Sequence, residues 1–285
     1  MDPKVHSVYY SLGGKNYYAV AFAEDLEKGQ FIYASKKYPI VQLADGRWWM
    51  AAPLAYVPDG YTVSGDPAED SGIWYTYTVD NKVATASTDN NDGYLYDYPT
   101  AMGKKADEIT FGTQAEWETG NYRDFEGAQG ICPPGWYIPT RADFLKLVGN
   151  SNKDDTRGET AAVNDPTALY YVTACNGSSV KVFNEAGWNW SFLGARNKTS
   201  NTQTGAYNVT VTDATKCSVD AWIGKPALNQ VMSSTAYKPN ATGTSFQYFC
   251  LMSTFTSAYM DGRLSLSYAQ YLQGVEVRCI RKQES

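Results

Sequence analysis

The sequence predicts a globular protein of the α+β class, in which short strands and long loops greatly outnumber helical segments. Aromatic residues make up 14% of the 285 residues, with 23 Tyr and 8 Trp, whereas charged residues make up only 19%. A chain this apolar and this aromatic folds around a core and is not disordered. Long helical patterns are scarce, and turn-forming Gly, Asn, Ser and Thr separate strand-like segments. The length suits one large domain or two ordinary ones.

Residues 1–37 predict an N-terminal β-hairpin extension, or the remnant of a preceding domain. Strand-like segments at 8–12 and 15–23 flank Gly13-Gly14, and glycine supplies the positive φ that a tight hairpin turn requires. Nothing in this stretch suggests chemistry, so we assign it a structural role. Residues 38–285 form the main predicted domain.

Between residues 40 and 102 the sequence predicts short strands joined by polar loops. The turn Asp45-Gly46 precedes an aromatic strand at 47–50, and a polar, acidic tract surrounds a further strand at 73–79. The segment 94–102 predicts a short helical turn, because Pro99 prevents a longer helix.

The clearest helix begins after Pro139. Thr140 is suited to the N-cap, where its side-chain oxygen accepts a hydrogen bond from a first-turn amide, and Asp143 suits the positive end of the helix. Gly149 is predicted to close the helix. The apolar face consists of Phe144, Leu147 and Val148. This face is predicted to pack on a sheet, so the role of the helix is structural.

Residues 150–245 are mostly polar connections with one aromatic group at 187–190. So long an irregular stretch is unusual in a compact domain and is often functional. A strand meander follows, with a turn predicted at Asp261-Gly262. Its predicted strands are 247–252, 254–260 and 264–268.

The last predicted strand, 275–280, alternates between two faces. Val275, Val277 and Cys279 share one face, and Glu276 and Arg278 share the other. Cys279 is therefore predicted to point inward.

The charge balance argues against nucleic acid as a partner. The chain has 24 Lys and Arg against 30 Asp and Glu, a net charge of −6, without a basic run or stripe. No stretch approaches the roughly 20 apolar residues that span a bilayer. Residues 1–4 lack the features of a secretory signal. Two interpretations stay open: a cytoplasmic protein, or an exported protein whose signal or lipid anchor has been removed, which the resemblance described below favours.

Five cysteines are widely spaced, and none forms a Cys-x-x-Cys pair, which disfavours a structural zinc site. They are Cys132, Cys175, Cys217, Cys250 and Cys279. Their odd number leaves at least one thiol free. From the residues alone, buried inert thiols in a reducing compartment and one disulfide in an oxidising compartment both stay open.

Several short blocks occur in a fixed order between residues 38 and 283. They are Asp45-Gly46-Arg47-Trp48-Trp49-Met50, Tyr96-Asp97-Tyr98-Pro99-Thr100-Ala101-Met102, Gly130-Ile131-Cys132-Pro133-Pro134-Gly135-Trp136-Tyr137-Ile138-Pro139-Thr140, Asn184-Glu185-Ala186-Gly187-Trp188, Gly194-Ala195-Arg196-Asn197, Ser253-Thr254 and Val277-Arg278-Cys279-Ile280. Together they resemble the Fibrobacter succinogenes major paralogous domain, which is abundant in envelope proteins of Bacteroidetes and Fibrobacteres. The block at 132–136, combined with the terminal Val-Arg-Cys, is the most specific part.

The resemblance implies a C-type-lectin-like fold: a small twisted antiparallel sheet, one or two helices, and long loops that present a ligand surface. It also implies an extracellular or outer-membrane location, since members often form the C-terminal part of surface lipoproteins and pilus-tip adhesins. The resemblance pairs Cys132 with Cys279 as a disulfide between the turn before the helix and the last strand. Closing so long a loop stabilises the fold by roughly 4–5 kcal/mol.

Enzyme chemistry is disfavoured because the one histidine, His6, lies near the N-terminus. Related sulfatase-modifying enzymes use a close cysteine pair that this chain lacks. Candidate acids for glycoside hydrolysis are Glu116, Glu118, Asp124 and Glu126. A solvated acidic face is the favoured interpretation of these acids. The tract 89–93 lacks the spacing of a calcium loop and is interpreted as a turn, and the sugar-binding signatures of calcium-dependent lectins are absent.

Ligand binding needs none of these groups, because Tyr and Trp supply rigid contact area, and Ser, Asn and Gly supply adaptable hydrogen bonds. The predicted ligand-contacting residues are Tyr259, Arg263, Tyr268, Gln270, Tyr271 and Gln273. In retroelement-diversified relatives this region carries the variable positions, although strand alternation places part of such a set in the core. The predicted core tryptophans are Trp48, Trp49, Trp136 and Trp188.

We therefore expect a non-catalytic, extracellular binding or adhesion domain of a bacterial cell-surface or pilus-tip protein. Its expected partner is a glycan or protein ligand on another cell or matrix, and no metal or cofactor is expected. Two alternatives stay open. One is an envelope carbohydrate-active enzyme or its sugar-binding accessory module, and the other is a structural pilus subunit whose N-terminal hairpin contacts other subunits.

Overall fold

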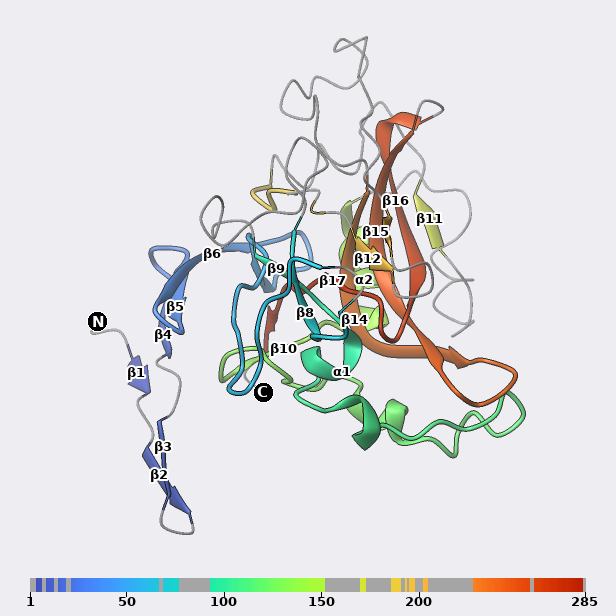
Figure 1. Cartoon of the computed structure of the whole chain (residues 1–285). Coiled ribbons are helices and arrows are strands. Elements are labelled where there is room, and N and C mark those ends of the chain that lie inside the picture. Colours follow the sequence, from blue (N-terminus) through green and yellow to red (C-terminus); the bar gives the residue numbers. More distant parts are fainter. Residues whose placement is uncertain are drawn as a thin grey trace.

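The structure is a computed structural model and is described for the following residues: 4–6, 9–12, 15–18, 22–66, 69–76, 93–151, 170–172, 186–190, 193, 195–197, 202–204, 228–256 and 259–283. Within these ranges the chain forms two seven-stranded sheets, two two-stranded sheets and two α-helices (Figure 1). Mainly antiparallel sheets with separate helices confirm the α+β class. No helix in this part of the chain is long and apolar enough to cross a membrane.

The first seven-stranded sheet joins N-terminal strands to the end of the chain. Its order is β1 (Lys4–His6), β4 (Phe22–Asp25), β5 (Gln30–Tyr33), β6 (Lys36–Gln42), β7 (Trp48–Met50), β18 (Ile280–Arg281) and β10 (Trp136–Tyr137). In β5, Phe31 and Tyr33 are buried and Ile32 is exposed, the alternation of a half-buried strand. Residue 37, the predicted boundary between the N-terminal extension and the main domain, lies in β6, which pairs with β5. The division of the chain at this residue stays a prediction.

The predicted N-terminal hairpin is formed by β2 (Tyr9–Leu12) and β3 (Lys15–Tyr18), in which Leu12 lies opposite Lys15. The predicted turn residues, Gly13-Gly14, lie outside the described residues. In Figure 1 this hairpin lies apart from the two larger sheets. The prediction of one strand over 15–23 is wrong in its length, because β3 ends at Tyr18 and β4 is a separate strand of the first sheet.

The second seven-stranded sheet contains the longest strands of the described chain. Its order is β11 (Tyr170–Val172), β16 (Tyr259–Gln270), β15 (Phe246–Thr256), β14 (Leu228–Pro239), β17 (Val275–Glu276), β9 (Tyr94–Tyr96) and β8 (Ile73–Tyr75). The pairing of β14 with β17 is parallel, and the other pairings are antiparallel. A separate two-stranded sheet consists of β12 (Ala195–Asn197) and β13 (Thr202–Thr204).

The turn predicted at Asp261-Gly262 is wrong. Both residues lie inside β16, and Thr256 lies opposite Tyr259, so the connection between β15 and β16 consists of residues 257–258, which are not described. Asp-Gly is a strong local turn signal, but here the pairing of two long strands outweighs it.

The predicted last strand is divided into β17 in the second sheet and β18 in the first. Val275, Val277 and Cys279 are buried in the main core, as the alternation predicts. The opposite face is buried as well, because Glu276 and Arg278 form an ion pair in which neither side chain is exposed.

Both predicted helices are present. α1 (Tyr98–Ala101) is a single turn, with Pro99 in its first turn and Asp97 as the N-cap that accepts a hydrogen bond from the Thr100 amide at 3.0 Å. α2 (Arg141–Ser151) continues past Gly149, so the predicted end of this helix is wrong. Phe144 and Leu147 are fully buried in one cluster with strands of the second sheet, whereas the side chain of Val148 is not described. Two 3₁₀ turns, η1 (Ala106–Glu108) and η2 (Asn121–Phe125), connect α1 to β10.

The disulfide implied by the family resemblance is present. Cys132 and Cys279 are bonded with their Cα atoms 5.9 Å apart, and both residues are buried. Cys250 is a free, buried thiol, and burial raises the pKa of this thiol to about 12, so it is predominantly protonated at neutral pH. Cys175 and Cys217 lie outside the described residues.

Three of the four tryptophans predicted for the core are confirmed. Trp49, Trp136 and Trp188 are fully buried. The prediction for Trp48 is wrong in part, because this residue packs against the core but is only half-buried. β7 is short, and in it Trp49 and Met50 take the buried positions.

Asp97 is expected to make the protein less stable as the pH rises from about 4 to about 6. Burial raises the pKa of this carboxyl from 3.8 to about 6. In this window the folded state keeps a proton that the unfolded state has lost, so stability present below pH 4 is lost as the pH passes the folded-state pKa.

The variant Asp97→Asn keeps a capping side chain but does not titrate. Its free energy of unfolding in urea, minus that of the wild type, should increase by up to about 3 kcal/mol between pH 4 and pH 7. A difference that does not change with pH would contradict the raised pKa.

Candidate functional site

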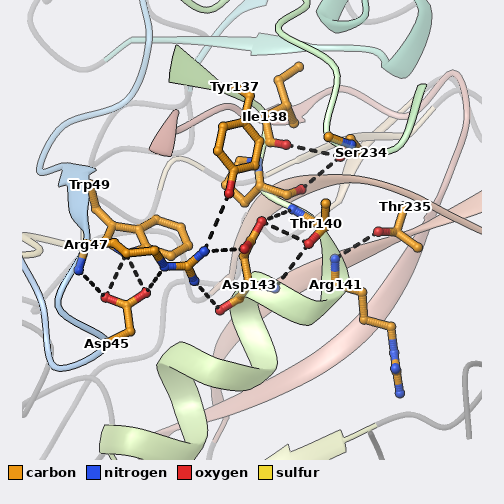
Figure 2. Close-up of polar contacts among 12 residues, drawn as sticks. Asp45, Arg47, Trp49, Tyr137, Ile138, Thr140, Arg141, Asp143, Ser234 and Thr235 are labelled. Atoms are coloured by element: carbon orange, nitrogen blue, oxygen red, sulfur yellow. Dashed lines mark hydrogen bonds and ion pairs between the residues drawn. The ribbon is translucent and has the colours of Figure 1, made fainter. Parts of the chain in front are cut away.

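The start of helix α2 is fixed by a buried ionic network (Figure 2). Arg47 donates from Nε to Asp45 at 2.7 Å and also forms an ion pair with Asp143 on α2. The Trp49 indole donates to Asp45 at 3.0 Å. Because these side chains are nearly inaccessible to water, the network holds the helix rigidly against the turn before β7.

The same aspartate also caps the helix. Asp143 accepts hydrogen bonds from the Thr140 amide and hydroxyl, both at 2.8 Å, and the Thr140 hydroxyl accepts from the Asp143 amide at 3.1 Å. This reciprocal arrangement confirms the N-cap predicted at Thr140 and satisfies amides that a helix start leaves unpaired.

Strand β14 is joined to the helix start by two hydroxyl side chains, which Figure 2 shows beside α2. The Ser234 hydroxyl accepts from the Gly127 amide at 2.9 Å and donates to the Ile138 carbonyl at 3.0 Å. The Thr235 hydroxyl accepts from the Arg141 amide at 2.9 Å and donates to Glu126 at 3.0 Å. Three chain segments are therefore held at fixed positions around one small space.

That space is a cavity of about 140 Å³, here called the α2 cavity. It is lined by Trp117, Arg123, Glu126, Arg141, Ala142, Thr235 and Ala236. The lining combines one aromatic ring, two guanidinium groups, one carboxylate and one hydroxyl. Such a mixture offers a flat aromatic face together with hydrogen-bond donors and acceptors.

The cationic side chains of the α2 cavity rest on aromatic rings. The Arg123 guanidinium lies 4.2 Å from the centre of the Trp117 ring and forms an exposed ion pair with Glu118 at 3.4 Å. The Arg141 guanidinium lies 4.9 Å from the centre of the Phe249 ring. Cation–π contacts hold these long side chains in place.

An aromatic strip, defined as Tyr237, Phe249 and Tyr268, extends from the α2 cavity across the second sheet. The Tyr237 ring packs on Phe249 at 5.0 Å and stacks on Tyr268 at 5.4 Å with an interplanar angle of 10°. Phe249 and Tyr268 are direct cross-strand partners. Since Arg141 contacts Phe249 and also lines the cavity, the strip and the cavity adjoin each other.

The predicted ligand-contacting residues do not form one group. Tyr268 lies in the aromatic strip and is exposed. Tyr271 instead packs on Phe111 and against the main core, and Gln273 donates to Gln230 at 2.6 Å and accepts from the Gln270 amide at 3.3 Å. The side chains of Tyr259 and Arg263 are not described. These assignments stay predictions. Tyr268 belongs to the aromatic strip, whose Phe249 contacts Arg141 of the α2 cavity.

The sequence reasoning missed most of the site. It did not single out Trp117, Arg123, Arg141, Tyr237 or Phe249 as residues of a site. A signal existed for the strip, because aromatic residues recur in three neighbouring strand-like segments. The sequence does not show that these residues meet, because this depends on the strand register, which places Phe249 opposite Tyr268.

The four candidate catalytic acids are exposed. Glu116 accepts a hydrogen bond from the Thr113 hydroxyl at 3.2 Å within its own loop, and Glu126 accepts one from Thr235 of β14 at 3.0 Å. In the described part of the chain no group of three or more His, Cys, Asp or Glu side chains is placed to hold a metal ion. The acidic tract at 89–92 lies outside the described residues.

The fold and the site together define a class: a disulfide-braced α+β domain with aromatic and cationic side chains around a surface cavity. The family model of the Fibrobacter succinogenes major domain matches residues 44–281, so the chain belongs to this family. No curated protein and no solved structure matches this chain.

Proposed function

We propose that this chain is a non-catalytic, extracellular recognition domain of a bacterial cell-surface or pilus-tip protein, with a C-type-lectin-like fold. The disulfide between the turn before α2 and the last strand supports this proposal, as do the mainly antiparallel sheets and the helix packed on one of them. The ligand that suits the surface best is a glycan on another cell or matrix.

The observation that carries this proposal is the aromatic strip, in which Tyr237 stacks on the exposed Tyr268 and Phe249 contacts Arg141 of the α2 cavity. The C–H face of a sugar ring packs on an aromatic ring, and its hydroxyls exchange hydrogen bonds with guanidinium, carboxylate and hydroxyl groups. Arg141, Glu126 and Thr235 supply all three kinds of group. Their positions are fixed before a ligand arrives, which lowers the entropy cost of binding.

A glycan array probed with the wild-type chain and with Tyr268→Ala should show this activity and its loss. Removing the exposed ring is expected to weaken binding to the recognised glycan about tenfold, since one aromatic stacking contact contributes on the order of 1 kcal/mol. Trp117→Ala should have a similar effect, because Trp117 lines the adjoining cavity.

The matched control is Ile32→Ala. Ile32 is 42% exposed and Tyr268 is 40% exposed, but Ile32 lies in the first sheet, away from the site. The proposed site would be wrong if Tyr268→Ala and Trp117→Ala left the glycan profile unchanged, or if Ile32→Ala lost as much glycan binding as they do. Polysaccharide cleavage by the wild type that is lost in Glu116→Gln or Glu126→Gln would instead establish an enzyme.

A further inference from the structure

We propose that the ligand site extends from the aromatic strip to Lys238, and that this lysine selects glycans carrying an acidic sugar residue. Such selection rests on the glycan binding proposed above and adds the class of glycan that is bound. Uronates and sulfated sugars share the chemistry in question, an anionic group that accepts hydrogen bonds from an ammonium.

Helix α2 covers only part of the face of the second sheet on which it packs. The cross-strand partners Leu251 and Leu266 lie in one hydrophobic cluster with residues of this helix. Two residues away on each strand, Phe249 and Tyr268 are partners on the same face, because alternate residues of a strand share a face. Tyr268 is exposed, so this face of the sheet reaches the surface beyond the helix.

The next row of the same face carries two side-chain amides. Gln247 and Gln270 are cross-strand partners, two residues beyond Phe249 and Tyr268, and both are half-buried. Within the described part of the chain, neither side-chain amide is hydrogen-bonded. An amide offers both donors and an acceptor, and a sugar hydroxyl can pair with either. These two residues, here called the amide row, therefore continue the aromatic strip as a surface for a sugar chain.

A β-bulge places Lys238 beside both the strip and the amide row. The pairing of β14 with β15 shifts between Ala236 and Lys238, so Tyr237 is an extra residue in β14. Lys238 lies opposite Gln247 and shares the face of the amide row. Its ammonium lies 5.2 Å from the centre of the Tyr237 ring, which in turn stacks on Tyr268. A sugar ring packed on the strip would therefore lie close to this ammonium.

Lys238 gives this surface a positive charge that no described carboxylate offsets. Its ammonium forms no ion pair with the residues that the structure describes, and neither the strip nor the amide row contains a carboxylate. In the adjoining α2 cavity, Arg123 and Arg141 are matched in number by Glu126 and by Glu118, the ion-pair partner of Arg123. An anionic group on the glycan therefore gains a charge-assisted hydrogen bond at Lys238 that a neutral glycan lacks.

The test is a glycan array on which each acidic glycan, a uronate or a sulfate, is printed beside its neutral counterpart, methyl-esterified or desulfated. The wild-type chain should bind the acidic members about fivefold more tightly than their counterparts, the factor expected of one exposed ion pair. Added salt should reduce this preference. Because uronates and sulfates are scored separately, the array also identifies the anionic group that is bound.

Lys238→Gln should abolish the preference for acidic glycans but leave the binding of their neutral counterparts unchanged, and Lys238→Arg should keep the preference. The matched control is Lys37→Gln, which removes the same charge from an exposed lysine of β6 in the first sheet. It should behave as the wild type. Gln247→Ala should weaken the binding of acidic and neutral members alike, because its amide pairs with sugar hydroxyls.

Equal binding of acidic and neutral counterparts by the wild type would overturn the assignment of Lys238. So would an unchanged preference in Lys238→Gln, or an equal loss of preference in Lys37→Gln. If Tyr268→Ala still weakens glycan binding in those cases, the proposed function stands and only the selection of acidic glycans fails. If the wild type binds no member of the array, both proposals fail.

Discussion

Replacing both Cys132 and Cys279 by serine is expected to lower the free energy of unfolding by about 5 kcal/mol. The disulfide closes a segment of 147 residues, and on the chain-entropy relation the stabilisation grows with the logarithm of this length. The total free energy of unfolding of a typical domain is only about 5–15 kcal/mol. The double variant should therefore be close to unfolded at physiological temperature, as measured by urea unfolding and thermal melting.

The control for this prediction is Cys250→Ala, which removes the free buried thiol but leaves the disulfide intact. It should cost much less, because only a small side chain is truncated. Thiol titration of the denatured, unreduced wild type should find three thiols at most, the five cysteines less the bonded pair. Five titratable thiols, or a double variant as stable as the wild type, would contradict the bridge.

Arg278→Met is expected to cost about 3–5 kcal/mol of unfolding free energy. The Arg278 guanidinium forms an ion pair with Glu276 and donates to the Trp188 and Asn189 carbonyls, the latter at 2.9 Å. Its Cζ atom also lies 4.7 Å from the centre of the Trp188 ring. Removing the arginine leaves a buried carboxylate without its ion-pair partner, which is the costly way to break such a pair.

The matched variant is Glu276→Leu combined with Arg278→Met, which removes both charges together. It should be more stable than Arg278→Met alone, since no charge is then left buried, although the two loop carbonyls still lose their donor. Urea unfolding of the three proteins measures both differences. If Arg278→Met were as stable as the wild type, the Glu276–Arg278 ion pair would contribute nothing to the free energy of unfolding.

Local features of the sequence predicted local structure well. The cap at Thr140, the short helical turn that begins at Tyr98-Pro99 and the inward face of the last strand all follow from patterns within a few residues. The disulfide could not be predicted from local patterns, because residue spacing left several cysteine pairings open. Only the family resemblance selected the pair Cys132 and Cys279.

The site was less accessible to sequence reasoning, because it depends on long-range register. Tyr237 and Tyr268 belong to strands that are not direct neighbours, and they stack across the intervening Phe249. Trp48 and Trp49 are adjacent and equally aromatic, yet only the pairing of a short strand decides which is fully buried. Composition predicts how many aromatic residues a surface has, but pairing decides where they meet.

The division of the last strand has a consequence for biosynthesis. β17 completes one sheet, β18 completes the other, and Cys279 between them reaches back to Cys132. The nascent chain can therefore finish neither sheet until residues 275–281 have left the ribosome. Contacts of such long sequence separation also slow folding, and strand edges exposed in the meantime attract other chains. A chaperone that shields those edges would act in the interval between synthesis of the chain and closure of the two sheets.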